Sequence, residues 1–191
     1  MLIIDEDTQL DFLLPAGALY VPGAEKLMPV LARIFEGARE RSVPIISSVD
    51  AHAENDPEFV DWPAHCVAGT LGQQKVPVTL LRDRAVVRNR PGVALPDRVP
   101  QVIVEKQTLD VFSNRNLLRL LERYPHEECA VLGVATDYCV RCAIEGLLNA
   151  GRKVKIITDA ICGIDAAASE KVLSGAVARG AELTTSRELW S

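Results

Sequence analysis

The stretch CAVLGVATDYCVRCAIEGLLNAGRKVKIITDA, residues 129–160, decides the fold. An apolar run of strand length fills 129–134, and a second run rich in β-branched residues fills 154–160. Between them, apolar side chains recur three and four residues apart over 140–148, which is typical of a helix. Because parallel strands need a long crossover connection, usually a helix, this order predicts two parallel strands of one sheet.

The same alternation extends over the rest of the chain. Apolar residues at helical spacing recur at 27–38, 117–121 and 165–180. Short apolar runs that indicate further buried strands are MLII (1–4), VPIISSV (43–49), QVIVEK (101–106) and AELTT (181–185). We therefore predict an α/β protein with one domain over residues 1–191. Its open, mostly parallel sheet is covered by helices on both faces, in a Rossmann-type three-layer arrangement.

Individual residues refine the expected helices. Pro29 must lie in or before the first turn of its helix, because proline in a helix interior breaks the hydrogen-bond ladder. Asp165 is expected to cap the last helix, which should end at Gly180. Leu118 and Val177 belong to the apolar stripes and are expected to face the sheet.

Composition and charge limit the partners of the protein. The chain is 48% hydrophobic, like ordinary globular proteins, and no apolar run approaches the roughly 20 residues of a membrane helix. Acids in the opening MLIIDED argue against an export signal, so the five cysteines are expected to be reduced thiols in the cytoplasm. A net charge of -5 leaves no basic surplus for nucleic acid. Homo-oligomerisation stays open.

Residues 50–100 break the alternation of strands and helices, and so long an irregular segment usually carries function. In open parallel sheets, ligands bind beyond the carboxyl ends of the strands. The polar residues that follow the predicted strands are expected to converge there, and they are Asp7, Asp50, Lys106 and Cys139. Because Asp5 and Glu6 are charged, we expect the first strand to end early and to leave Asp7 less deeply placed.

Cys139 admits four interpretations. With Thr136 as N-cap it lies in the first turn of a helix, where the positive end of the dipole favours a thiolate nucleophile. It could instead form a thioredoxin-like redox pair with Cys142, or a zinc-binding module with it, or be an inert core residue. The spacers Val140 and Arg141 disfavour the redox pair. A nucleophilic thiol needs a base and a cation near the developing charge, and Asp7 and Lys106 together would form a coherent set with Cys139. The alternative is that Asp7 is a turn or cap residue and Lys106 a solvated surface lysine.

A second group of residues is suited to a metal ion. Alternation along an extended chain puts Asp50 and His52 of the DAH motif on one side, and His65 of WPAHC can approach from the loop. Glu58 is a candidate fourth ligand. Such hard or borderline ligands with open positions are typical of a catalytic or substrate-binding divalent ion. The alternative is that both histidines are ordinary surface residues of the loop.

Together these motifs resemble a known family. DTQLDF, DAH, WPAHCVAGTLG, the lysine of VEK and GVATDYCV are similar, in order and approximate spacing, to motifs of the nicotinamidase and isochorismatase-like cysteine hydrolases. The resemblance covers nearly the whole chain and implies the isochorismatase-like fold. It also implies a catalytic triad of Cys139, Asp7 and Lys106. The oxyanion hole would be formed by the backbone N–H groups of Ala135 and Cys139, with a cis peptide bond between Val134 and Ala135.

The nicotinamidase branch implies more about substrate and cofactor. Nicotinamide or a related pyridine carboxamide would be hydrolysed to the free acid and ammonia. A divalent ion, zinc or else iron or manganese, would be held by Asp50, His52 and His65, with Glu58 as the further candidate. Phe12 and Trp62 match positions that flank the substrate ring, although both could be plain core residues. The rival within the family is a metal-independent isochorismatase-like enzyme or carbamoyl amidohydrolase. Where the family has an aromatic residue inside D-W-H, this chain has Ala51, which alters the pocket wall.

Overall fold

The protein is described by a computed structural model of residues 1–125 and 128–190. Its centre is a seven-stranded sheet in the order β3-β4-β2-β1-β5-β6-β7, and every neighbouring pair is parallel. The strands are β1 (Leu2–Glu6), β2 (Ile45–Asp50), β3 (Arg84–Val87), β4 (Gln101–Lys106), β5 (Glu128–Val134), β6 (Lys153–Cys162) and β7 (Glu182–Thr184). The predicted α/β class and parallel sheet are confirmed.

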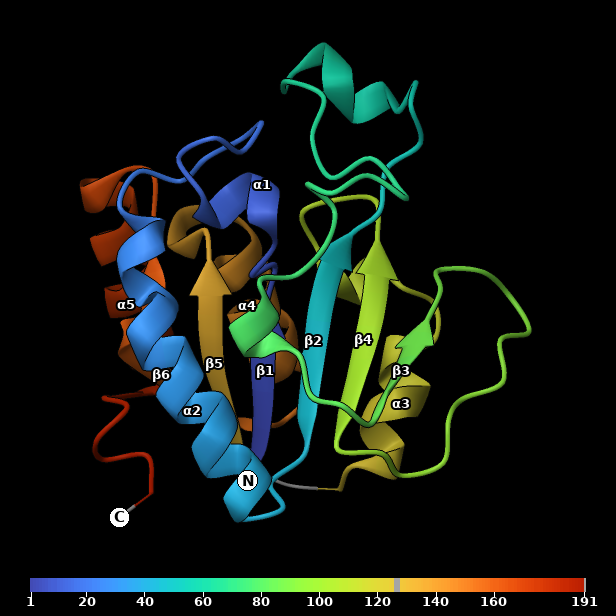
Figure 1. Cartoon of the computed structure of the whole chain (residues 1–191). Helices are drawn as coiled ribbons and strands as arrows, with labels where there is room; N and C mark the ends of the chain where they lie inside the picture. The colour runs from blue at the N-terminus through green and yellow to red at the C-terminus, as the bar shows by residue number, and fades with distance from the viewer. Residues whose placement is uncertain (126–127, 191) are drawn as a thin grey trace.

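Helices cover both faces of the sheet (Figure 1). The α-helices are α1 (Leu10–Leu13), α2 (Met28–Glu40), α3 (Leu117–Arg123), α4 (Arg141–Asn149) and α5 (Ala166–Ala178). Shorter helical turns are η1 (Ala24–Leu27), η2 (Pro57–Val60), η3 (Pro77–Thr79), η4 (Val111–Ser113) and η5 (Thr136–Val140). Side chains of α1 and α2 pack in one buried apolar cluster, and those of α3, α4 and α5 pack in the other. The two clusters lie on opposite faces because successive strand residues alternate in direction.

The ends of the helices agree in part with the sequence. Pro29 lies in the first turn of α2, and the Asp165 carboxylate accepts a hydrogen bond from the Ala168 N–H at 2.6 Å, so both predictions are confirmed. The prediction that Leu118 and Val177 face inward is wrong, because their exposed fractions are 58% and 45%. Each lies at the margin of its stripe, where the helix surface already turns toward solvent. No helix in the described part of the chain is long and apolar enough to cross a bilayer.

Two strands differ from expectation. β1 continues through Asp5 and Glu6, and Asp7 is fully buried, so the predicted early end of the strand is wrong. The acids are accommodated because Asp5 forms an ion pair with Lys75 at 2.8 Å, and Glu6 shares a hydrogen bond with the Ser48 hydroxyl at 2.7 Å. β3 was not anticipated, since its four residues, RAVV, form an edge strand too short to give a pattern.

The sheet topology places a site at the carboxyl end of β1. The chain continues from β1 to β2 on one side, whereas β5 lies on the other, and such a switch point opens a crevice. The irregular segment after β2 rises over the ends of the strands (Figure 1). β1 and β5 approach closely there, where Gly133 pairs with Glu6. A side chain at Gly133 would clash with the Glu6 carbonyl, and its φ of 119° also requires glycine.

Candidate active site

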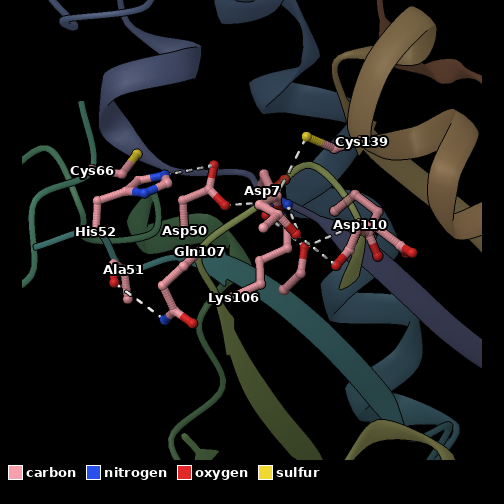
Figure 2. A network of polar contacts seen from close by, with 12 residues as sticks. Asp7, Asp50, Ala51, His52, Cys66, Lys106, Gln107, Asp110 and Cys139 are labelled. Atoms are coloured by element: carbon pink, nitrogen blue, oxygen red, sulfur yellow. Dashed lines mark hydrogen bonds and ion pairs between the residues drawn. The ribbon is translucent and has the colours of Figure 1, made fainter. Parts of the chain in front are cut away.

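Lys106 links the polar residues that follow the central strands (Figure 2). It is fully buried at the end of β4. Its ammonium nitrogen lies 2.5 Å from Asp50 Oδ1 and 2.8 Å from Asp7 Oδ2, and it donates to the Thr108 carbonyl at 3.0 Å. The same nitrogen is 3.7 Å from Cys139 Sγ. The structure thus brings together the four residues that were expected to converge from separate strands.

Burial and the lysine control the protonation of this cluster. Burial tends to lower the pKa of Lys106, but the carboxylates of Asp50 and Asp7 raise it well above its usual value. At Asp50 the Lys106 ammonium outweighs burial and lowers the pKa of that carboxyl. At Asp7 burial dominates and raises the pKa. Asp7 is therefore a stronger base than an exposed carboxylate would be.

Cys139 lies in η5, just before α4, and differs in two respects from expectation. Thr136 is not the N-cap, since the turn starts at Thr136 itself and Ala135 occupies the cap position. Burial raises the pKa of the Cys139 thiol well above its usual value, although the Lys106 ammonium opposes this. The expected resting thiolate is therefore replaced by a neutral thiol, which needs a base before it can attack. The peptide bond between Val134 and Ala135 is cis, as the family resemblance implied.

Asp50, His52 and His65 form a compact buried group with one ligand atom of each within 4.8 Å of the others. Nε2 of either histidine lies 3.8 Å from Asp50 Oδ2. His65 Nδ1 is 2.8 Å from the Pro63 carbonyl, so it carries the proton and leaves the lone pair of Nε2 facing Asp50. His52 Nε2 is buried and has no hydrogen-bond partner among the described residues. These unshared donor atoms fit a divalent ion.

An apolar pocket opens between this group and Cys139. Phe12, Trp62 and Tyr138 line it, together with Ala135 and Glu58. The Trp62 and Tyr138 rings meet edge to face with centroids 5.3 Å apart, and Phe12 packs 5.4 Å from the His65 ring. Glu58 lies at the pocket wall but outside the compact group of Asp50 and the two histidines. Burial raises the pKa of Glu58.

Two polar residues that position the site, Gln9 and Asp11, were not predicted from the sequence. The Gln9 side chain brackets the Asp50 backbone, since its Nε2 donates to the Asp50 carbonyl at 2.9 Å and its Oε1 accepts from the Asp50 N–H at 2.7 Å. Asp11 Oδ2 accepts from the Cys66 N–H at 2.7 Å, beside His65. Both belong to DTQLDF, so the motif carried the signal without showing what each residue holds.

The other cysteines have no contact with the pocket. Cys66 and Cys129 are buried, Cys142 and Cys162 are half-buried, and each of the five cysteines is a free thiol. Of these, only Cys139 lines the pocket in the described part of the chain. This arrangement favours Cys139 as the reactive thiol and leaves Cys142 as its packed neighbour one helical turn further on.

A buried thiol, carboxylate and lysine lie beside three residues that could hold a metal ion, at the switch point of a parallel sheet, where α/β proteins bind their ligands. The family model for the isochorismatase domain matches residues 1–188, and the chain belongs to the isochorismatase family. It is therefore a hydrolase of that family.

Known relatives and solved structures agree with this assignment. The chain is 28% identical to the nicotinamidase of Escherichia coli K12 over 182 residues, which cover 83% of this chain and 81% of that protein. It resembles the pyrazinamidase of Pyrococcus horikoshii in complex with zinc, with a TM-score of 0.80, 29% identity and coverage of 96% and 98% of the two chains. It also resembles PnC1 from L. infantum in complex with nicotinate, with a TM-score of 0.81, 26% identity and coverage of 98% and 93%.

Proposed function

We propose that this protein is a cysteine amidohydrolase of the nicotinamidase type, which converts nicotinamide or a related pyridine carboxamide to the free acid and ammonia. The observation that carries the proposal is the position of Lys106, which contacts Asp7, Asp50 and Cys139 at once. This single lysine joins the nucleophile and its base to the metal-binding group. We assign the activity to one domain over residues 1–191 and, because its cysteines are free thiols, to the cytoplasm.

In the first half of the reaction, Asp7 takes the proton of the Cys139 thiol, and Sγ attacks the carboxamide carbon. The Lys106 ammonium, 3.7 Å from Sγ, stabilises the thiolate as it forms. The N–H groups of Ala135 and Cys139 would hold the developing oxyanion. Asp7 then returns its proton to the amide nitrogen, so that the C–N bond breaks, ammonia leaves and a thioester remains on Cys139.

In the second half, water attacks the thioester carbon. Asp7 again accepts a proton, now from the water, and the Cys139 sulfur leaves as the acid product forms. Sγ recovers the proton from Asp7, which restores the neutral thiol favoured by burial. The raised pKa of Asp7 suits both directions of this transfer.

The metal-binding group would orient the substrate. Asp50, His52 and His65 would hold one divalent ion, zinc by preference and iron or manganese as alternatives, with Glu58 as a further ligand. Such an ion, when bound, would act as a Lewis acid that coordinates the pyridine nitrogen. Gln9 fixes the backbone of Asp50, and Lys106 holds its Oδ1, so that Oδ2 stays directed at the histidines.

The lining of the pocket favours a neutral aromatic substrate. Phe12 and Trp62 would flank the ring, and Leu19, Val21 and Ile164 extend the apolar wall. No arginine or lysine is among the described residues that line the pocket. Isochorismate and carbamoyl amino acids carry carboxylates, which would meet Asp50 and Glu58 there without a basic side chain in compensation. A pyridine carboxamide has no such charge.

The proposal is tested by ammonia release from zinc-loaded enzyme with nicotinamide, pyrazinamide and a carbamoyl amino acid in parallel. We expect turnover of the two neutral aromatic amides, none of the carboxylate substrate, and none of any substrate by Cys139→Ala. Folded, zinc-loaded enzyme that leaves nicotinamide intact but hydrolyses the carbamoyl amino acid would refute the substrate class. Retained activity in Cys139→Ala would refute the nucleophile.

A further inference from the structure

Glu6 is a buried acid next to the proposed catalytic base. It is the last residue of β1, fully buried, and its Oε2 lies 2.7 Å from Ser48 Oγ. The same Ser48 oxygen lies 2.6 Å from Asp7 Oδ1 and accepts the Asp7 N–H at 3.1 Å. One hydroxyl therefore bridges two carboxyl groups, Glu6 on one side and Asp7 on the other.

The number of protons in this bridge is fixed by the geometry. Both oxygen–oxygen distances are those of hydrogen bonds, and each bond needs a proton between its two atoms. The Ser48 hydroxyl has one proton and can donate to only one carboxyl group. The second proton must come from a carboxyl group, so either Glu6 or Asp7 is protonated in this arrangement.

The surroundings decide between the two acids. Asp7 Oδ2 lies 2.8 Å from the Lys106 ammonium, which favours an ionised Asp7. Glu6 Oε1, in contrast, is buried without a hydrogen-bond partner among the described residues. Glu6 borders a small cavity whose other described lining is apolar and comes from β1, β2, η4, α3 and α4, including Ile46, Leu121 and Leu147. An ionised carboxylate is costly in such a place.

The charges near Glu6 act in the same direction. The charges that act most strongly on it are those of Asp7, Lys106 and Asp5, and of these Lys106 alone is basic. Burial and the negative charge of Asp7 raise the pKa of Glu6 to about 8, whereas Lys106 and the Ser48 hydrogen bond oppose the rise. Glu6 thus keeps its proton at neutral pH.

We propose that Glu6 is a positioning residue of the active site. Its protonated carboxyl group donates a hydrogen bond to Ser48 Oγ, which fixes the Ser48 hydroxyl as a donor to Asp7 Oδ1. That bond occupies Oδ1 and leaves Oδ2, beside Lys106, as the oxygen that receives the Cys139 proton. This inference rests on the proposed role of Asp7 as the base and concerns a residue that the family motifs do not include.

Loss of the Glu6 proton at alkaline pH should slow the reaction. The Ser48 hydroxyl must then serve two carboxylates, and a second negative charge is added beside Asp7. Because Ser48 no longer holds Asp7 in one orientation, kcat should fall while binding of a neutral amide in the pocket changes little.

The direct test is infrared difference spectroscopy of the protein without substrate, parent minus Glu6→Gln. We expect a carboxylic-acid carbonyl band in the parent at neutral pH that Glu6→Gln lacks and that disappears as the pH rises through about 8. Absence of the band at neutral pH would overturn the proposal. Because no turnover is involved, this result is independent of whether nicotinamide is the substrate.

Kinetics separate a positioning role from a merely structural one. The amide introduced by Glu6→Gln can still donate to Ser48 but cannot ionise, so this variant should lose the alkaline decline of kcat that the parent shows. Glu6→Met and Ser48→Ala remove the donor, and each should lower kcat at neutral pH about tenfold or more with little change in KM. Melting curves verify that the variants fold. The proposal is overturned if Glu6→Met keeps the parent kcat, or if Glu6→Gln keeps the alkaline decline.

Discussion

The end of β1 contributes to two buried aspartate–lysine pairs. One of them holds the fold together, whereas the other lies beside the proposed nucleophile. Asp5 and Lys75 lie 2.8 Å apart, as do Asp7 and Lys106. Both oxygens of Asp5 are hydrogen-bonded, Oδ1 to the Thr8 hydroxyl at 2.8 Å and Oδ2 to the Ser47 hydroxyl at 2.6 Å. The Asp5 pair is thus fully satisfied and fastens the segment after β2 to the sheet.

The pair of Asp7 and Lys106 at the pocket has an atom without a full set of hydrogen bonds. Asp7 Oδ2 has no hydrogen bond of good geometry within the described residues, despite its short ion-pair distance to Lys106. Two further buried atoms without a hydrogen-bond partner among the described residues, Glu6 Oε1 and His52 Nε2, lie around the same cluster. Most buried polar groups are paired in native proteins, so unpaired ones that gather in one place indicate a site built to bind and react.

The largest expected difference is between the two aspartates. Asp7→Asn should lower kcat about 10⁴-fold, because no other base replaces it, as measured by ammonia release from nicotinamide. Asp5→Asn is the matched control and should keep turnover per folded molecule within about tenfold of the parent. Equal losses in the two variants would erase the distinction between the pairs.

The two lysine substitutions should affect stability in the opposite order. Lys75→Met, away from the pocket, should destabilise the fold more than Lys106→Met does. Lys75→Met leaves Asp5 as a buried charge without its cation and should lower the free energy of unfolding by about 3–5 kcal/mol in urea titrations. In Lys106→Met the acids Asp7 and Asp50 can relieve their repulsion by taking up a proton, so activity should fall much further than stability. A Lys106→Met variant that unfolds as readily as Lys75→Met yet remains active would contradict this assignment.

Metal binding tests whether Asp50, His52 and His65 hold an ion beside the pocket. Zinc at a hundred times its Kd should stabilise the folded protein by about 2.7 kcal/mol, seen as a higher Tm that a chelator reverses. His52→Ala should lose both the stoichiometric metal and the shift in Tm. Glu54→Ala, at an exposed acid of the same loop, is a control that should keep both. Zinc that still raises Tm in His52→Ala would place the ion elsewhere.

The raised pKa of Glu6 should make the free energy of unfolding depend on pH. Its pKa in the folded protein, about 8, exceeds the ordinary value of 4.5, so between these values only the folded state holds the proton. Stability from this group is therefore complete below pH 4.5 and is lost as the pH rises through about 8. Relative to the parent, Glu6→Gln should gain on the order of 5 kcal/mol from acidic to alkaline pH, measured by urea titration. A constant difference between the two proteins would argue against the raised pKa.

The smallest effect is expected at the second cysteine of the pair. Cys142→Ser should cost about 1 kcal/mol of stability through poorer packing and leave the reaction in place. A thiol redox or zinc-binding pair would instead make Cys142→Ser as inactive as Cys139→Ser. Parallel activity assays of the two serine variants distinguish these cases.

Much of the site follows from the sequence because parallel strands end at one edge. Asp7, Asp50, Lys106 and Cys139 each follow an apolar run, and the rule that such ends converge was enough to group them. The metal group needed one further step, the alternation along DAH. The roles of these residues in catalysis remain predictions.

The rest depends on pairs that sequence spacing does not reveal. Lys75 lies 70 residues from Asp5 along the chain, and without that contact the acids of β1 predict a broken strand rather than a buried one. Ser48 of β2 hydrogen-bonds to both Glu6 and Asp7 at the end of β1. This contact depends on the register of the two strands, which the sequence does not show. β3 was missed because a four-residue edge strand carries too little apolar pattern.

In the proposed reaction, Asp7 and Lys106 activate Cys139 for attack on an amide. The most direct test of this step is acid quench of zinc-loaded enzyme during turnover of nicotinamide, followed by mass spectrometry of the cysteine peptides. We predict a nicotinoyl thioester on Cys139 alone, which appears before the free acid and is absent from Cys139→Ala and Asp7→Asn. Steady production of nicotinate without an adduct at Cys139 in any quenched sample, or with an adduct on another residue, would show that Cys139 is not the nucleophile.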